Sequence, residues 1–90
     1  MKHLNIYVYG KVQGVFFRHH TNLKAQALGL KGFVKNQDDG SVYIEVEGKE
    51  NLLQDFLEWC KYGPDAASVD RVDVQKGVVQ SFSTFEILYK

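Results

Sequence analysis

The chain has 90 residues, of which 44% are hydrophobic and 24% are charged, and its formal net charge at pH 7 is zero. This composition is typical of a single globular domain spanning residues 1–90, and it excludes disordered, collagen-like and low-complexity chains. A net charge of zero also argues against general affinity for nucleic acids, which requires a broad basic surface.

The charges are unevenly distributed along the chain. Residues 1–37 contain six Lys and Arg residues and no Asp or Glu, so this segment carries +6; the other five cations and all eleven acids give residues 38–90 a charge of −6. An anionic ligand is therefore expected to bind mainly to residues of the first segment.

Membrane association and secretion are not predicted. No apolar run approaches the ~18 residues of a membrane span, and the first residues lack the continuous apolar stretch of a secretory signal. The one cysteine, Cys60, cannot form an intrachain disulfide and is expected to be a free thiol. These features predict a cytoplasmic protein in a reducing compartment.

A strand, a loop, a helix and a second strand are predicted in the first half of the chain. Alternating apolar residues indicate a strand over residues 3–9, and two glycines indicate a loop over residues 10–16. Apolar residues then recur at helical spacing from Phe17 to Leu28, with Gly29 as a C-cap. Residues 30–37 form the second predicted strand.

A hairpin, a second helix and two further strands are predicted in the remainder. Asp39-Gly40 indicates a tight turn, and the strand that follows alternates buried valine and isoleucine with Tyr43, Glu45 and Glu47, which are expected to face solvent. A helical stripe runs from Leu52 to Cys60. Strands are predicted over residues 69–74 and 85–89, and residues 77–83 fit no element.

The order of these elements is β-α-β-β-α-β followed by a short terminal strand. It predicts an α+β fold of the ferredoxin-like, split βαβ type, with an antiparallel sheet and two helices on one face. This fold supports many unrelated functions, so the functional prediction depends on individual residues.

The loop before the first helix carries the strongest local signal. Helix N-termini favour anions, yet Arg18 lies in the first turn with no acid nearby to pair with it. A bound phosphate would remove this conflict, because the planar guanidinium donates two parallel hydrogen bonds to it. The alternatives are an exposed arginine in solvent and a loop that only connects two elements.

His19 and His20 follow Arg18 and suggest a metal site or a general base. Adjacent helical residues point ~100° apart, so the two side chains cannot serve one site from one face. No cysteine or carboxylate lies near them in the sequence to complete a ligand set. We predict no metal and no cofactor.

Asn36 lies near the end of the second predicted strand, just before the turn. Asparagine is common beside turns, where it caps the backbone. Its side chain can also donate and accept hydrogen bonds, which suits it to orient a water molecule. Sequence spacing leaves both interpretations open.

These two segments resemble the signatures of the acylphosphatase family. The pattern G-x-V-Q-G-V-x-[FY]-R is met from Gly10 to Arg18, and G-[FYW]-[AV]-x-N-x-x-x-G-x-V is met from Gly32 to Val42, followed by Gly48. The resemblance extends over the whole chain and includes the expected fold. Phe33 stands where the family often has tryptophan, which we expect to affect only packing.

The resemblance implies hydrolysis of acyl phosphates to a carboxylate and inorganic phosphate. It implies that Arg18 binds the phosphate and that Asn36 orients the attacking water. It further implies a phosphate-binding loop of backbone N–H groups, contributed by Val12, Gln13, Gly14, Val15, Phe16, Phe17 and Arg18. The partner is then a small-molecule acyl phosphate, with no nucleic acid and no membrane, and the chain is expected to be a monomer.

This chemistry is reasonable without an acid, a base or a metal. The carboxylate leaving group has a conjugate-acid pKa of about 4 and departs without protonation. Phosphoryl transfer is usually loose at the transition state, so positioning and charge stabilisation suffice. An alkyl phosphate would have to expel an alkoxide, so poor activity on ordinary phosphomonoesters is expected.

Two non-catalytic alternatives remain. Residues 31–34 faintly resemble the aromatic signature of RNA-recognition motifs but lack its further aromatics, so a nucleic-acid-binding module is disfavoured. An anion-sensing module could keep the loop and lack turnover. A related interpretation is the acylphosphatase-like domain of larger carbamoyl-transfer maturation proteins.

Overall fold

The computed structural model describes residues 1–89, which form two helices and a five-stranded sheet. The elements, in chain order, are β1 (Lys2–Lys11), α1 (Phe17–Ala27), β2 (Lys31–Asn36), β3 (Val42–Gly48), α2 (Glu50–Cys60), β4 (Ser68–Gly77) and β5 (Phe85–Leu88). The predicted order of helices and strands is confirmed. The strand β1 extends past the predicted end into Gly10 and Lys11, where its register with β4 shifts.

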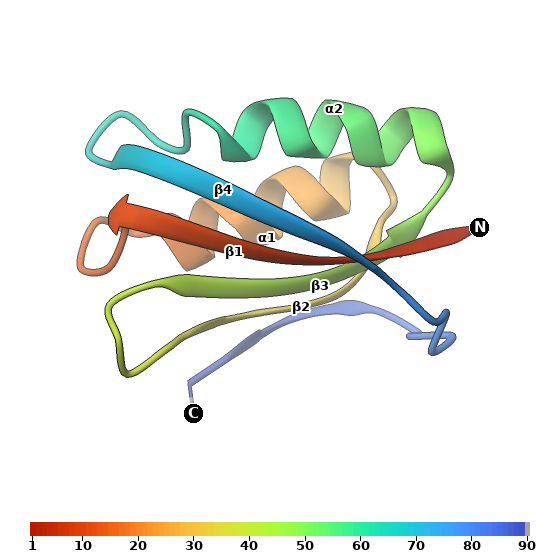
Figure 1. Ribbon diagram of the computed structural model, residues 1–90. Helices are drawn as coiled ribbons and strands as arrows, with labels where there is room; N and C mark the ends of the chain where they lie inside the picture. The colour runs from red at the N-terminus through yellow and green to blue at the C-terminus, as the bar shows by residue number, and fades with distance from the viewer. Residues whose placement is uncertain (90) are drawn as a thin grey trace.

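The strands lie in the order β4-β1-β3-β2-β5, and both helices cover the same face of the sheet (Figure 1). The first four strands pair in antiparallel fashion, as predicted, with Ile6 opposite Ile44 and Val34 opposite Ile44 at the centre. The edge strand β5 pairs with β2 in parallel, so the complete sheet is mixed. The ferredoxin-like α+β fold is confirmed.

The hydrophobic core lies between the sheet and the two helices. Every second residue of the central strands points into it, which explains the alternating apolar pattern of β1 and β3. The helices contribute residues at helical spacing: Phe17, Thr21 and Ala25 from α1, and Leu53, Phe56 and Cys60 from α2. Complete burial raises the pKa of the Cys60 thiol far above its ordinary value, so this cysteine serves packing.

The prediction that Glu47 faces solvent is wrong. Its side chain is buried, and its carboxylate accepts hydrogen bonds from the backbone N–H groups of Gln80 and Phe82 and from Nδ1 of His3. The cause is the segment between β4 and β5, which had no predicted structure. It crosses this end of the sheet to reach the far edge and covers Glu47 and His3.

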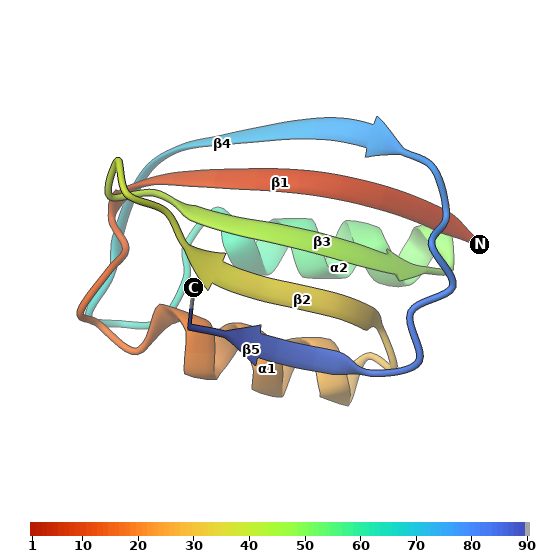
Figure 2. The ribbon, with the colours of Figure 1, turned by 90° about the horizontal axis from the view of Figure 1, so that it is seen from below.

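At the opposite end of the sheet, several segments distant in sequence come together. Figure 2 shows the end of β5 beside the start of α1 and the loop that follows β1. The end of β2 lies at the same end of the sheet. Among residues 1–89, neither α1 nor α2, each of 11 residues, has the length and apolar character needed to cross a membrane.

Candidate active site

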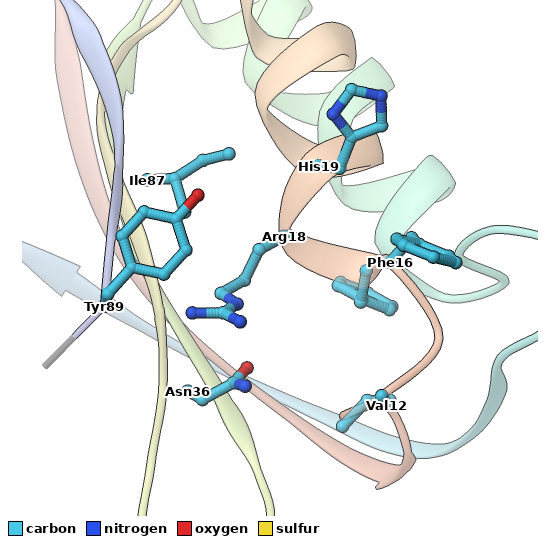
Figure 3. A pocket seen from close by; sticks show the side chains of 9 residues that line it. Val12, Phe16, Arg18, His19, Asn36, Ile87 and Tyr89 are labelled. Atoms are coloured by element: carbon cyan, nitrogen blue, oxygen red, sulfur yellow. The ribbon is translucent and has the colours of Figure 1, made fainter.

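A cavity of about 340 Å³ opens at this end of the sheet (Figure 3). We call it the Arg18 cavity. Its lining residues are Val12, Gly14, Phe16, Phe17, Arg18, His19, Asn36, Ile87 and Tyr89. Seven of these nine residues come from the first 37, and none of the nine is acidic, so the cavity suits an anion.

The N-terminus of α1 opens into the Arg18 cavity without a cap. Phe16 occupies the N-cap position in the left-handed conformation, with φ of 61°. No side chain of residues 1–89 accepts a hydrogen bond from the first turn. The first intrahelical hydrogen bond runs from the N–H of His20 to the carbonyl of Phe16. The preceding N–H groups therefore have no partner within the helix and form the positive end of its dipole.

The loop before α1 turns through a second left-handed residue. Gly14 has φ of 74°, which costs a glycine little and a larger residue more, although its surroundings leave room for a side chain. Left-handed residues alternating with others turn successive N–H groups toward one side, the arrangement of an anion nest. The backbone conformation therefore favours glycine at position 14, whereas the space around it would admit a side chain.

Arg18 is half-buried and extends from the first turn of α1 into the cavity. Its Nη1 donates a long hydrogen bond of 3.5 Å to the carbonyl of Leu88, and its Cζ lies 4.8 Å from the centre of the Tyr89 ring. Among residues 1–89 it has no carboxylate partner. The remaining donors of the guanidinium group are available to a ligand.

Asn36 is the last residue of β2, and its carboxamide points toward the guanidinium group of Arg18 (Figure 3). Its Oδ1 atom is buried and has no hydrogen-bond partner among residues 1–89. A buried acceptor without a donor costs about 1–3 kcal/mol, so such atoms normally have a partner.

Two residues of the predicted phosphate-binding loop have side chains that do not line the Arg18 cavity. The amide of Gln13 donates hydrogen bonds of 2.7 and 2.9 Å to the carbonyls of Gln37 and Ser41, in the β2–β3 connection. Val15 is buried and lines a neighbouring cavity. Gln13 therefore joins the loop to the turn that follows Asn36.

The two histidines diverge, as the helical geometry predicts. Their rings lie edge to face with centres 5.3 Å apart, and only His19 lines the Arg18 cavity, while His20 lines its neighbour. Across residues 1–89 no group of three or more His, Cys, Asp and Glu side chains is placed to hold a metal ion.

Ile87 and Tyr89 were not predicted to contribute to the site. They enter from β5 and from the residue after it, and the carbonyl of Leu88 reaches Arg18 across 70 positions of sequence. Nothing near Tyr89 in the sequence marks it, because its contact depends on the parallel pairing of β5 with β2.

Comparison with known proteins matches this site and fold to one family. The acylphosphatase family model matches residues 4–87. The acylphosphatase of Archaeoglobus fulgidus is 48% identical over 86 residues, which cover 96% of this chain and 97% of that protein. The crystal structure of the acylphosphatase from Bacillus subtilis superposes with a TM-score of 0.96 at 40% identity, covering 99% of this chain and all of that one.

A larger protein contains a similar unit. The crystal structure of HypF from T. kodakarensis has a TM-score of 0.87 at 35% identity, and the match covers all of this chain and 12% of that one. The comparisons confirm the predicted fold and activity, and they do not support a non-catalytic anion-sensing or nucleic-acid-binding module. The chain belongs to the acylphosphatase family and is an enzyme that hydrolyses acyl phosphates.

Proposed function

We propose that Arg18 and the backbone N–H groups of residues 12–18 bind the phosphoryl group, and that Asn36 positions the attacking water. The observation that carries this proposal is the convergence of three groups on one cavity. These are the uncapped N-terminus of α1, a guanidinium group without a carboxylate partner among residues 1–89, and the buried, unpartnered Oδ1 of Asn36.

The reaction follows from these positions. The phosphoryl oxygens accept hydrogen bonds from Arg18 and the loop, which stabilise the charge that they carry in the transition state. A water molecule donates a hydrogen bond to Oδ1 of Asn36 and directs its lone pair at phosphorus. As the new P–O bond forms, the bond to the acyl oxygen breaks and its electron pair leaves with the carboxylate. The proton of the water passes to phosphate or solvent.

The leaving group decides which substrates react. A carboxylate is a good leaving group without protonation, because its conjugate acid has a pKa of about 4. Among residues 1–89, no carboxyl side chain lines the Arg18 cavity to protonate an alkoxide, and the ring of His19 points away from the guanidinium group of Arg18 (Figure 3). We therefore propose that catalysis requires no metal, and that alkyl phosphates are turned over poorly.

The experiment measures release of phosphate from benzoyl phosphate in excess chelator. Wild-type turnover is expected to persist, and Arg18→Ala is expected to lower kcat/KM by about 10²–10³-fold, the usual cost of losing a donor to developing charge. Arg71→Ala is the matched control, because Arg71 also stacks on a tyrosine ring, at 4.2 Å from Tyr9, and lies outside the cavity.

Two results would contradict the proposal. Loss of wild-type activity in chelator would show that a metal takes part. Equal activities of the Arg18→Ala and Arg71→Ala variants would remove Arg18 from the phosphate site. Circular dichroism of each variant shows whether the fold is intact.

We further propose that the chain acts as a cytoplasmic monomer and that residues 1–90 function as one domain. The free, buried thiol of Cys60 suits a reducing compartment, and the helical stripes are used within one core. Light scattering of the purified protein tests the mass: about 10.3 kDa is expected, and about twice that value would show a dimer.

A further inference from the structure

Phe16 combines two unfavourable features. Its side chain is 77% exposed, and its backbone adopts φ of 61°, a conformation that is costly for a bulky residue. The N-cap position that it occupies normally carries Ser, Thr, Asp, Asn or Gly. The left-handed turn explains the backbone, but glycine would make the same turn with less strain. The aromatic ring therefore needs a separate reason.

Phe16 separates two cavities. Among residues 1–89 it is the only residue that lines both the Arg18 cavity and a second cavity of about 430 Å³. This second cavity, here called the Trp59 cavity, lies between the start of α1, the end of α2 and the loop that follows α2. Trp59 and Pro64 give it apolar walls, and Asp65 is its acidic residue.

The in-line geometry of phosphoryl transfer indicates how the two cavities are used. In phosphoryl transfer the attacking and leaving oxygens lie roughly in line on opposite sides of phosphorus. Asn36, which positions the water in the proposed mechanism, lies across the Arg18 cavity from Phe16 (Figure 3). The acyl group must then leave on the side of Phe16, toward the Trp59 cavity.

We propose that Phe16 is a specificity-determining residue, and that its ring and the Trp59 cavity bind the acyl group of the substrate. The chemistry of these walls fits an uncharged aromatic acyl group, whose ring gains from stacking on phenylalanine. This inference rests on the proposed position of the phosphoryl group at Arg18.

The test compares kcat/KM for benzoyl phosphate and acetyl phosphate in three variants. Phe16→Gly removes the ring, and glycine readily adopts φ of 61°, so folding is preserved. Phe16→Tyr keeps the ring. Leu23→Ala is the control, because Leu23 is an exposed apolar residue of α1 that lines neither cavity.

Phe16→Gly is expected to lower the preference for benzoyl over acetyl phosphate by about three- to tenfold, the range of an aromatic pair. Phe16→Tyr, which keeps the ring, is expected to retain the wild-type preference. Leu23→Ala is expected to retain both the preference and, within about twofold, the inhibition constant of inorganic phosphate. An equal loss on both substrates in Phe16→Gly would overturn the inference.

The inference and the mechanism can fail separately. Retained activity in Arg18→Ala would reject the phosphate site, whatever the substrate preference of the Phe16 variants. A full loss in Arg18→Ala together with an unchanged preference in Phe16→Gly would reject only the acyl site.

Discussion

In the proposed mechanism, the side-chain oxygen of Asn36 favours activity over stability. It is buried without a donor, which is unfavourable in a folded protein at rest and useful in one that must hold a water molecule. The sequence alone leaves two interpretations of Asn36 open: it caps the backbone of the turn, or it orients a water molecule. Its position opposite Arg18 supports the second interpretation, and no hydrogen bond of a turn cap is formed by its Oδ1.

Replacing Asn36 with alanine is expected to separate turnover from binding. Asn36→Ala removes the acceptor for water but leaves Arg18 and the loop in place, so kcat should fall by about 10²-fold or more while the inhibition constant of phosphate stays within about twofold. Because the unpartnered oxygen is removed, the variant should melt at the same or a higher temperature than the wild type. Weaker phosphate binding would contradict the water-orienting role.

At the scale of elements, the site depends on how loops are attached to one another. The sequence predicts the five strands and the two helices of the fold, because apolar alternation and helical spacing are local patterns. Attachments such as that of Gln13 to the carbonyls of Gln37 and Ser41 join residues 24 and 28 positions apart and have no local pattern. The motif predicts that the backbone N–H group of Gln13 belongs to the phosphate-binding loop. The motif does not predict that the side chain of Gln13 links this loop to the β2–β3 connection.

The Gln13→Ala variant tests what this link between the loop and the β2–β3 connection contributes. Two hydrogen bonds that fix the loop relative to the β2–β3 turn are lost, so the free energy of unfolding should fall by about 1–3 kcal/mol. Since Asn36 immediately precedes that turn, kcat should also fall, by about ten- to 100-fold. Urea denaturation and steady-state kinetics measure both effects.

Asn22→Ala is the matched control for Gln13→Ala. It removes an exposed side-chain hydrogen bond of 3.3 Å from Gln26 on α1, away from the cavity, and should change neither quantity measurably. If Gln13→Ala were destabilised but retained the wild-type kcat, the hydrogen bonds of the Gln13 side chain would be purely structural and would not position Asn36.

At the scale of the molecule, β5 connects two distant features. At its start, the segment from β4 is fixed to Glu47 by the N–H groups of Gln80 and Phe82; at its end, Leu88 and Tyr89 contact Arg18. The sequence predicts neither end. The acidic residue at position 47 follows the solvent-facing pattern of Tyr43 and Glu45, and only the path of the chain across the sheet buries it.

The buried pair of His3 and Glu47 should make the stability of the whole fold depend on pH. Nδ1 of His3 lies 2.7 Å from Glu47, and its Nε2 lies 2.8 Å from Oδ1 of Asn5 and 3.1 Å from Glu45, so the charged ring donates to acceptors on both sides. Burial opposes that charge, but the hydrogen bonds and the two carboxylates outweigh it and raise the pKa of His3 above 6.5. Burial likewise opposes the charge of Glu47, yet its three donors lower its pKa below 4.5.

The stabilisation from each of the two pKa shifts is lost when pH changes in opposite directions. The contribution of Glu47 is present above pH 4.5 and is lost as pH falls through its lowered pKa, whereas that of His3 is present below pH 6.5 and is lost as pH rises through its raised pKa. The pair therefore stabilises the fold most between pH 4.5 and 6.5. Glutamine at position 3 keeps a donor but cannot carry the charge.

His3→Gln should therefore cost about 1.5–3 kcal/mol of unfolding free energy at pH 6, the range for a hydrogen bond to a charged group, and less at pH 9. Urea denaturation at the two pH values measures this difference, and His20→Gln, which replaces an exposed histidine of α1, is the control. A cost that is the same at both pH values would mean that folding does not shift the pKa of His3. A larger cost at pH 9 would reverse the sign of the pKa shift, because only a histidine that binds its proton more tightly in the folded state stabilises it more at low pH.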